Sequence, residues 1–424
     1  MKKKKSKKVG IIGLGVVGSE LVSQITKNMS RIEKETGISL EISKIYVRTL
    51  HKTRTIDTTG LPLTTNIDEI IHNPSIDIIC ECMGGNGFEQ TRDFILQALK
   101  NRKHMIMSSK KALAKYAGLL LENAYSSNVH LKYDACVGGG IPIAKVLDNA
   151  FKSDKVLKIM GIFNATSNYI YSKMFTEALS FDEALIKAQE NGYAENDPSD
   201  DVDGYDSLYK LTILAIFGMK KIIDPDLLLP DSFAKISIKD MKYADELGYR
   251  IKPIALLKQV NGSMEYKIGQ CMIASDHIIA NTLNNFNTIL IEGENCGELD
   301  FYGQGAGAKP TATAMFDDLL NILTSPVPFD VFAFSKINAD TIVKYESKLY
   351  WRFTLRNEVG VLSELTAILA KNNINIEKFI QKEATETGME IVLLSSDVAP
   401  SEVDTIIKQL NTLNIENNSV IPLV

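Results

Sequence analysis

The 424-residue sequence has few cysteines, little net charge and no long apolar run. It contains five cysteines, one tryptophan and five histidines, and its formal net charge is −5. The scattered cysteines are too few for a disulfide framework, which favours a reducing, cytoplasmic location. The weak negative charge argues against a nucleic-acid partner, and the short apolar runs argue against a membrane. With 45% hydrophobic and 23% charged residues, the composition is that of a globular protein with room for about three domains.

The N-terminus combines a basic segment, MKKKKSKK, with the apolar segment VGIIGLGVVG. A signal peptide has the same order of parts, but here glycines interrupt the apolar segment and no small-residue cleavage site follows. We therefore expect residues 1–8 to form a basic, solvated tail.

A dinucleotide-binding turn follows directly. Val9 to Ile12 predict a short strand, GLGVVG follows it, and residues 19–25 have a helical pattern. This is the G-x-G-x-x-G fingerprint in its strand–turn–helix setting, where the phosphates of a dinucleotide lie at the helix N-terminus. Strands and helices alternate to about residue 150, so we predict a Rossmann-type parallel-sheet domain over residues 1–150. The candidate cofactor contacts in the turn are Gly13, Gly15, Val16, Val17 and Gly18.

The second predicted strand, residues 42–47, ends in Arg48, and Lys52 and Arg54 follow closely. An acidic residue at that strand end would hold the ribose 2′-hydroxyl of NAD, whereas a basic residue favours the 2′-phosphate of NADP. NADP(H) is therefore the favoured cofactor and NAD(H) the alternative, although these basic side chains could simply face solvent.

Two further strand ends supply candidates for the cofactor site. The apolar run 76–83 ends at Gly84, and the strand 104–107 leads into Ser108-Ser-Lys110-Lys111. Ligands bind at the carboxyl ends of the strands in open α/β sheets. Lys111 could therefore meet a nicotinamide or a carbonyl oxygen there, or could be an ordinary surface lysine.

A glycine run, Gly138 to Gly140, follows a strand predicted over residues 129–136 and precedes a helix over residues 143–151. Three glycines allow close approach of the backbone to a ligand, or to an ion held by main-chain carbonyls. Tight packing would explain the run equally well.

An acidic stretch, residues 188–215, holds the most concentrated chemistry of the chain. Asp206 and Lys210 lie four residues apart on an apolar helical pattern, so both face one side of the helix, while Glu195 reaches this region from a turn. Such a group could grip a small zwitterion and move a proton. The alternative is an acidic solvated loop with an ordinary helix salt bridge.

The second half of the chain reads as an α+β domain over residues 151–325 and a smaller module over residues 349–424. In the first, strands are predicted over residues 251–260, 264–273 and 288–292. Glycines Gly305 and Gly307 then precede a helix that returns to the cofactor domain within residues 303–325. Residues 326–348 are the expected linker. The last module has the ferredoxin-like order β-α-β-β-α-β, and its first turn suits an amino-acid carboxylate.

Taken together, these residues resemble homoserine dehydrogenase with a C-terminal ACT domain. The resemblance rests on GYAENDPSDDVDGYDSLYK, which is close to the family signature G-Y-x-E-x-D-P-x-x-D-(V/L)-x-G-x-D-x-x-x-K. Supporting matches are GLGVVG, SSKKAL, DACVGGGIPI, GIFNATSNYI and GQGAG.

The resemblance implies NAD(P)-dependent interconversion of L-homoserine and L-aspartate 4-semialdehyde in threonine, methionine and isoleucine biosynthesis. It implies that Lys210 is the acid/base lysine, that Asp206 positions the substrate, and that Lys111 contacts cofactor and substrate. Because Lys110 stands where the family has Asn, which lysine acts is left open. The implied contacts to the amino-acid end of the substrate are Gly192 and Glu195, with Asp201 as a further candidate.

The resemblance also implies a cation site, an effector and an assembly. A monovalent cation, usually sodium, would be held largely by carbonyl oxygens of Asp134, Val137, Gly139 and Ile141. Feedback regulation by an amino acid, threonine above all, would act through the ACT turn at Asn357, Gly360 and Leu362. ACT domains pair side by side, so a homodimer or homotetramer is expected.

Two other functions compete with this one. The first is an NAD(P)-dependent oxidoreductase of another small amino or hydroxy acid, and the second is a non-catalytic amino-acid sensor. A sensor would be expected to lose Lys210 or Asp206, and both are present. The presence of Glu195 at the signature spacing likewise favours the homoserine enzyme over another oxidoreductase.

Overall fold

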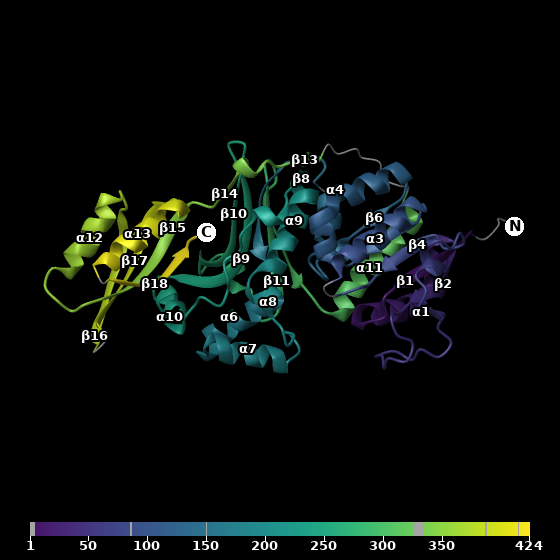
Figure 1. The fold of residues 1–424 in the computed structure, drawn as a ribbon, viewed down its shortest axis with the longest axis horizontal. Coiled ribbons are helices and arrows are strands. Elements are labelled where there is room, and N and C mark those ends of the chain that lie inside the picture. The colour runs from purple at the N-terminus through teal and green to yellow at the C-terminus, as the bar shows by residue number, and fades with distance from the viewer. Residues whose placement is uncertain (1–4, 85–86, 150, 326–333, 386–387, 414) are drawn as a thin grey trace. The chain divides into compact units, whose positions relative to one another are not determined.

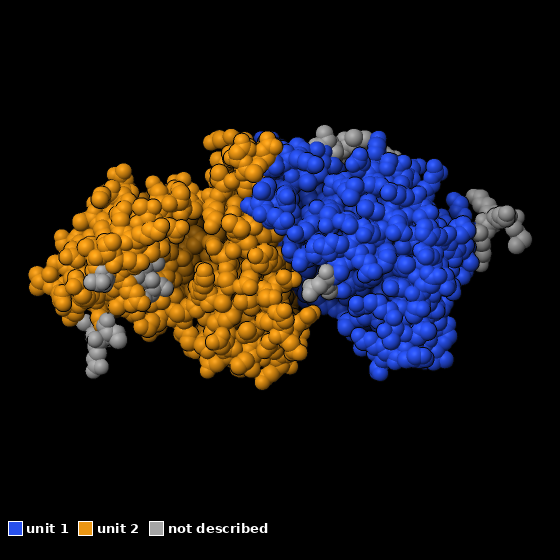
Figure 2. Space-filling model, viewed as in Figure 1, with its two compact units in different colours: residues 1–157, 209–227, 289–337 blue, residues 158–208, 228–288, 338–424 orange. Residues whose placement is uncertain are grey.

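The computed structural model describes residues 5–84, 87–149, 151–325, 334–385, 388–413 and 415–424. The chain forms two compact units, each assembled from segments far apart in the sequence (Figure 2). Unit 1 contains residues 1–157, 209–227 and 289–337, and unit 2 contains residues 158–208, 228–288 and 338–424. No helix in the described part of the chain is both long enough and apolar enough to cross a membrane.

Unit 1 is built on a six-stranded sheet with the order β3-β2-β1-β4-β5-β6 (Figure 1). All neighbouring strands run parallel. The strands are β1 (Lys5–Ile12), β2 (Ile38–Tyr46), β3 (Leu63–Thr64), β4 (Ile78–Glu81), β5 (His104–Met107) and β6 (Leu131–Lys132). The strand order reverses between β1 and β4, which is where doubly wound sheets bind their ligands. The predicted Rossmann-type sheet is confirmed.

Seven helices accompany this sheet among the described residues of unit 1. They are α1 (Val16–Thr36), α2 (Asp68–Ile71), α3 (Phe88–Lys100), α4 (Lys110–Ser127), α5 (Ile143–Asn149), α11 (Ala308–Thr324) and all but the first turn of α9 (Tyr205–Met219). The unit also contains the short strands β8 (Lys221–Ile222) and β13 (Ser335–Lys336), which pair with one another. The neighbouring strands β11 (Phe286–Gly293) and β12 (Gly297–Gln304) lie mainly in it as well.

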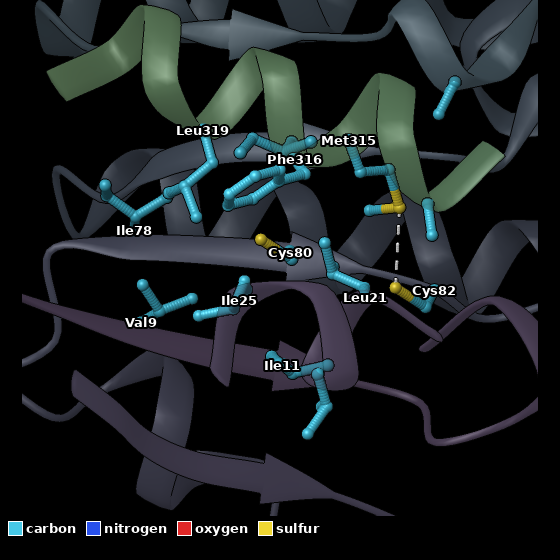
Figure 3. Close-up of a cluster of buried hydrophobic side chains, with 14 of the residues drawn as sticks. Val9, Ile11, Leu21, Ile25, Ile78, Cys80, Cys82, Met315, Phe316 and Leu319 are labelled. Carbon is cyan, nitrogen blue, oxygen red and sulfur yellow. Dashed lines mark hydrogen bonds between the residues drawn. The ribbon is translucent and has the colours of Figure 1, made fainter. Parts of the chain in front are cut away.

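The core of unit 1 joins residues some three hundred positions apart in the chain. Leu21 and Ile25 share one face of α1 because they lie four residues apart, and they pack with Met315 and Leu319 of α11. Figure 3 shows these side chains over the strands, where the Cys82 sulfur lies 3.6 Å from the Met315 sulfur. Helix α11, which lies almost three hundred residues later in the sequence, therefore covers the apolar face of α1.

Two parts of unit 1 differ from the sequence-based expectation. Strand β1 begins at Lys5 instead of Val9, so the prediction of a solvated tail was wrong for residues Lys5 to Lys8. These residues pair with β2, and the Lys7 ammonium lies 2.7 Å from a carboxylate oxygen of Asp77. The strand predicted over residues 129–136 is confined to β6, and a 3-10 turn, Asp134–Cys136, follows. The strand ends there because the Asp134 amide donates to the Asp318 carboxylate (3.0 Å) instead of to a neighbouring strand.

Unit 2 has a mixed sheet in which β7, β9, β10 and β14 are neighbours in that order. Their bounds are β7 (Val156–Ile162), β9 (Tyr249–Val260), β10 (Ser263–Ala274) and β14 (Ile342–Lys344). Strands β9 and β10 form a long hairpin closed by Asn261 and Gly262, both with positive φ, as a two-residue turn of this kind requires. The helices of this part are α6 (Ala165–Glu177), α7 (Phe181–Glu190), α8 (Ser199–Val202) and α10 (Ile238–Glu246).

The C-terminal module of unit 2 has the predicted ferredoxin-like topology. Its elements are β15 (Ser347–Leu355), α12 (Val361–Lys371), β16 (Ile376–Thr385), β17 (Gly388–Val398), α13 (Pro400–Thr412) and β18 (Glu416–Pro422). The antiparallel sheet has the order β16-β17-β15-β18 (Figure 1). Trp351 and Phe353 face a core shared with α12 and α13, whereas Tyr350 packs with Met241 of α10 on the opposite face.

The expected linker over residues 326–348 is partly built into the fold. Residues 335–336 form β13, residues 342–344 form β14 at the edge of the unit 2 sheet, and β15 already begins at Ser347. The first part of this linker, residues 326–333, lies outside the described residues.

Candidate active site

The glycine turn between β1 and α1 has the geometry of a phosphate-binding loop. Gly13 has φ +99°, and a Cβ on Gly18 would lie 2.2 Å from the Gly13 carbonyl oxygen, so only glycine permits this packing of helix against strand. A Cβ on Gly15 would meet nothing within 4 Å, which leaves open space at the helix N-terminus. Val16 is exposed and Val17 half-buried beside it. Backbone N–H groups at this helix start are suited to a pyrophosphate.

The loop after β2 is held by Arg54, the third of the basic residues that favour a 2′-phosphate in the sequence. The Arg54 guanidinium donates hydrogen bonds to the carbonyl oxygens of Leu50 (3.0 Å), Thr49 (2.5 Å) and Lys52 (2.8 Å). These bonds fold the loop back on itself, and Arg48 and Lys52 remain exposed. Both predicted cations are therefore accessible to a ligand phosphate.

Glu81 is a structural element of the cofactor site that sequence reasoning missed. Its fully buried carboxylate accepts hydrogen bonds from the amides of Met83 (2.6 Å), Ser108 (3.1 Å) and Ser109 (3.1 Å), and from the Ser109 hydroxyl (2.8 Å). Burial raises the pKa of this carboxyl, and the four hydrogen bonds oppose that shift. The Glu81 carboxylate thereby ties the segment that leads to Gly84 to Ser108 and Ser109, which directly precede α4. The available signal was the second acid of the run IDIICECM, which stands among apolar residues at the end of a strand predicted to be buried.

Lys111 lies in the first turn of α4, which begins at Lys110. Its ammonium lies 5.0 Å from the ring centre of Phe88 and 5.5 Å from that of Tyr209, so it links α4 to α9. Lys210 follows Tyr209 directly and is only 7% exposed. Further along α9, Phe217 stacks on Tyr133 with ring centres 3.5 Å apart. Unit 1 therefore places both predicted catalytic lysines on helices that are in contact.

Asp201 and Asp206 are brought together by Asn164, whose role the sequence did not reveal. The Asn164 amide nitrogen donates to Asp201 Oδ1 (2.7 Å) and to Asp206 Oδ2 (2.9 Å), while its oxygen accepts from the Ser167 amide at the start of α6 (2.7 Å). The Ser167 hydroxyl also donates to the Asp201 carbonyl (3.0 Å). Asn164, Asp206 and Ser167 are buried. The result is a rigid pair of carboxylates at the start of α9.

Gly192 and Glu195 lie in the exposed turn between α7 and α8. Gly192 has φ +72°, and its amide donates to the Gln189 carbonyl (3.0 Å), so this amide closes the end of α7. The turn is tied to α6 because the Thr166 hydroxyl donates to the Tyr193 carbonyl (2.7 Å). The Glu195 side chain is exposed, and the Gln189 side-chain amide donates to the Glu195 backbone carbonyl (3.2 Å).

The two glycine-rich segments of unit 1 are in direct contact. The Gly140 amide donates to the Gln304 carbonyl (2.9 Å). A Cβ on Gly139 (φ +56°) would lie 2.5 Å from the Gly305 carbonyl carbon, and Gly307 precedes α11 with φ +117°. The predicted cation ligands Val137, Gly139 and Ile141 therefore lie on a backbone that the 304–307 segment braces.

The side chain of the fourth predicted ligand, Asp134, is buried beside another acid. Burial raises the pKa of Asp134 to about 6 and that of Asp318 to about 7, and Lys145, 3.6 Å from Asp134 Oδ2, opposes the shift at Asp134. The Asp134 Oδ1 atom is buried without a hydrogen-bond partner among the described residues. Among the residues that the structure describes, no group of three or more His, Cys, Asp or Glu side chains is placed to hold a metal ion.

The effector turn of the C-terminal module is exposed from Asn357 to Gly360. Gly360 has φ +94° and precedes α12, whereas Leu362 is half-buried and packs on the module's core. This leaves the start of α12 open to solvent.

Comparisons with known proteins agree with this architecture. The family model described as homoserine dehydrogenase, NAD binding domain, matches residues 13–134, that described as homoserine dehydrogenase matches residues 142–320, and the ACT domain model matches residues 352–414. The homoserine dehydrogenase of Bacillus subtilis is 31% identical over 419 residues, covering 97% of this chain and 96% of that protein. That of Synechocystis is 33% identical over 420 residues, covering 96% of each.

Solved structures show the same relationship. The crystal structure of a homoserine dehydrogenase from Thiobacillus denitrificans superposes with a TM-score of 0.90 at 32% identity, covering 99% of this chain and 98% of that one. The chain belongs to the homoserine dehydrogenase family.

Proposed function

We propose that Lys210 and Lys111 perform the acid–base chemistry by which this NAD(P)-dependent enzyme interconverts L-homoserine and L-aspartate 4-semialdehyde. The nicotinamide, when bound, gives or takes the hydride at the carbon that bears the oxygen. A lysine ammonium donates a proton to that oxygen in reduction, and the neutral amine removes it in oxidation. The burial of Lys210 supports its role, because a buried side chain is held in a defined position for proton transfer.

The observation that carries the proposal is the bridge from Asn164 to Asp201 and Asp206. Two carboxylates fixed by one amide form an anionic wall that suits the ammonium of a substrate amino acid. Asp206 lies one helical turn before Lys210 on the continuous helix α9. Glu195 and the Gly192 carbonyl are the proposed further contacts, reached from the turn tied to Thr166.

The test is NADPH consumption with L-aspartate 4-semialdehyde by the wild type and by Lys210→Ala, with Lys220→Ala at the end of the same helix as the matched control. Loss of an acid–base group typically lowers kcat by 10² to 10⁴-fold, whereas the control should retain normal turnover. Turnover of Lys210→Ala equal to that of the wild type would move the role to Lys111. Normal turnover of Lys111→Ala as well would refute the proposal.

NADP(H) is the proposed preferred cofactor. The exposed cations Arg48 and Lys52, on a loop folded by Arg54, support this preference because the 2′-phosphate needs a positive partner. In Arg48→Ala, kcat/KM should fall with NADPH and stay constant with NADH. A parallel loss with both cofactors would contradict a 2′-phosphate contact.

A sodium ion is proposed at the carbonyl oxygens of Asp134, Val137, Gly139 and Ile141. Hard cations prefer oxygen ligands, and a carbonyl oxygen already in a hydrogen bond keeps a second lone pair. The ion would brace the backbone that meets Gly305. Unfolding temperatures in sodium and in tetramethylammonium chloride would test it, since only a specific site distinguishes the two cations.

An amino-acid effector, threonine first among the candidates, is proposed for the ACT turn, together with a homodimer or homotetramer formed by ACT pairing. The exposed start of α12 at Gly360 supports carboxylate binding. Turnover measured with added threonine and mass measured by light scattering test the two parts separately.

A further inference from the structure

Unit 2 contains a cavity that none of the functions above uses. It has a volume of ≈ 100 Å³ and lies between α6, β9 and the segment after β10. A single water needs about 10–15 Å³ measured in this way, so the space admits a small organic or inorganic ion. Its lining residues are Tyr171, Ser172, Phe175, Arg250, Ile251, Lys252, Ala280, Asn281 and Leu283.

The wall of this cavity carries a buried cation without an acidic partner. Lys252 is 3% exposed, and its ammonium donates one hydrogen bond, to the Thr282 carbonyl oxygen (2.6 Å). In the described parts of the chain, no carboxylate lies within ion-pair distance of it. An ammonium has three donors, and a buried charge without a counter-ion is costly. The site is therefore short of a negative charge.

A second cation faces the same cavity from the same strand. Arg250 and Lys252 lie two residues apart on β9, so their side chains leave the same face of the sheet. Arg250 donates two hydrogen bonds to described residues, one to Asp245 and one to the Tyr249 carbonyl, and both come from Nη1. The N–H groups of Nε and Nη2 therefore remain available to a ligand. The guanidinium carbon lies 4.3 Å from the ring centre of Phe175, which fixes its plane at the cavity edge.

The two cations repel one another. Burial, and then the charge of Arg250, lower the pKa of Lys252 to about 8. The other titratable groups around Lys252 are the Tyr171 hydroxyl on α6 and the Cys271 thiol opposite in register on β10, and both of these pKa values are raised by burial. Neither group supplies a negative charge to Lys252 near neutral pH. The carboxylate that pairs with Arg250, Asp245, forms no ion pair with Lys252 among the described residues, so the lysine still lacks a counter-ion.

We propose that this cavity binds a small oxyanion, a carboxylate or phosphate group, between the Lys252 ammonium and the Arg250 guanidinium. The site goes beyond the dehydrogenase reaction and its ACT effector. The cavity wall includes Tyr171, Ser172 and Phe175 of α6. The N-cap residue of that helix, Asn164, donates hydrogen bonds to Asp201 and Asp206. An anion in the cavity would thus brace the helix that holds the carboxylate pair.

The test follows the unfolding temperature of the full-length enzyme in sodium acetate, in sodium phosphate and in acetamide, with sodium chloride keeping the ionic strength constant. Acetamide is the neutral isostere of acetate and should have no effect. Lys252→Met should weaken anion binding at least tenfold, and Lys258→Met, further along the same strand, is the matched control. The acetate and phosphate arms show which oxyanion the cavity prefers.

Arg250→Gln keeps the test decisive if Lys252→Met fails to fold, because Arg250 is partly exposed and its loss spares the buried lysine. This variant should also bind the anion more weakly, by severalfold. Equal stabilisation by acetate and acetamide, or anion effects unchanged in both variants, would overturn the proposal.

Discussion

The contact between the ACT sheet and α10 offers a quantitative test of how the C-terminal module is attached to the rest of unit 2. The Arg352 guanidinium on β15 binds Asp240 of α10 through Nε–Oδ1 (2.7 Å) and Nη2–Oδ2 (3.2 Å), and the Tyr350 hydroxyl donates to the same carboxylate (3.0 Å). The side chains of Arg352 and Asp240 are 9% and 2% exposed. Removing one partner of such a buried pair strands the other charge, which costs about 3–5 kcal/mol.

The perturbation is therefore a double-mutant cycle with Arg352→Met and Asp240→Asn. Each single variant should lose several kcal/mol of unfolding free energy, and the double variant should lose less than the sum by roughly 1–3 kcal/mol. Asp240 also closes the capping box of α10 with Ser237, so its own substitution should cost about 1 kcal/mol more.

Urea unfolding followed by tryptophan fluorescence is the assay, because Trp351 is the only tryptophan of the chain and lies buried in the strand that carries Arg352. The matched control is Lys382→Met, which breaks a more exposed ion pair to Glu246 between the same parts and should cost under about 1 kcal/mol. Strictly additive losses, or an Arg352→Met loss no larger than the control's, would refute the reasoning.

Three further predictions concern unit 1. Glu81→Gln should raise the KM for NADPH more than it lowers kcat, because an amide cannot accept all four hydrogen bonds of the carboxylate; an unchanged KM in steady-state assays would contradict this role. Gly139→Ala should lower the unfolding temperature, since its Cβ would lie 2.5 Å from the Gly305 carbonyl carbon at a positive φ, and a wild-type melting curve would argue against the brace. Burial, with His104 and Lys132, lowers the pKa of the buried His130 from 6.5 to about 4, so stability present above pH 6.5 should be lost as the pH falls toward 4, by up to roughly 3 kcal/mol. His130→Leu should flatten that part of the acid limb in urea midpoints, and an unchanged slope would exclude His130 as its origin.

The elements with strong local signals were predictable. The strand–turn–helix of the glycine fingerprint and the βαββαβ order of the last module follow from periodicity and turn residues, and the structure has both. The wrong start of the first strand has a physical reason: the basic segment Lys5–Lys8 reads as a solvated tail, yet its backbone pairs with β2, and the Lys7 side chain reaches Asp77.

Long-range polar contacts were not predictable. Asn164 stands in a turn rich in polar residues, and nothing local distinguishes it from its neighbours as the residue that would bridge Asp201 and Asp206. The Asp240–Arg352 pair joins residues 112 positions apart. Such contacts depend on tertiary packing, which a single sequence does not encode in any short window.

The packing of α11 on α1 also sets an order of events during synthesis. Leu21 and Ile25 are translated early, but their partners Met315 and Leu319 leave the ribosome only when about three quarters of the chain exists. Until then the first nucleotide-binding helix has an uncovered apolar face, and nascent chains of this length are the ones a chaperone would recognise. A truncated product ending near residue 157 would lack α11 and would keep that face exposed, so we expect a cofactor domain cut there to aggregate.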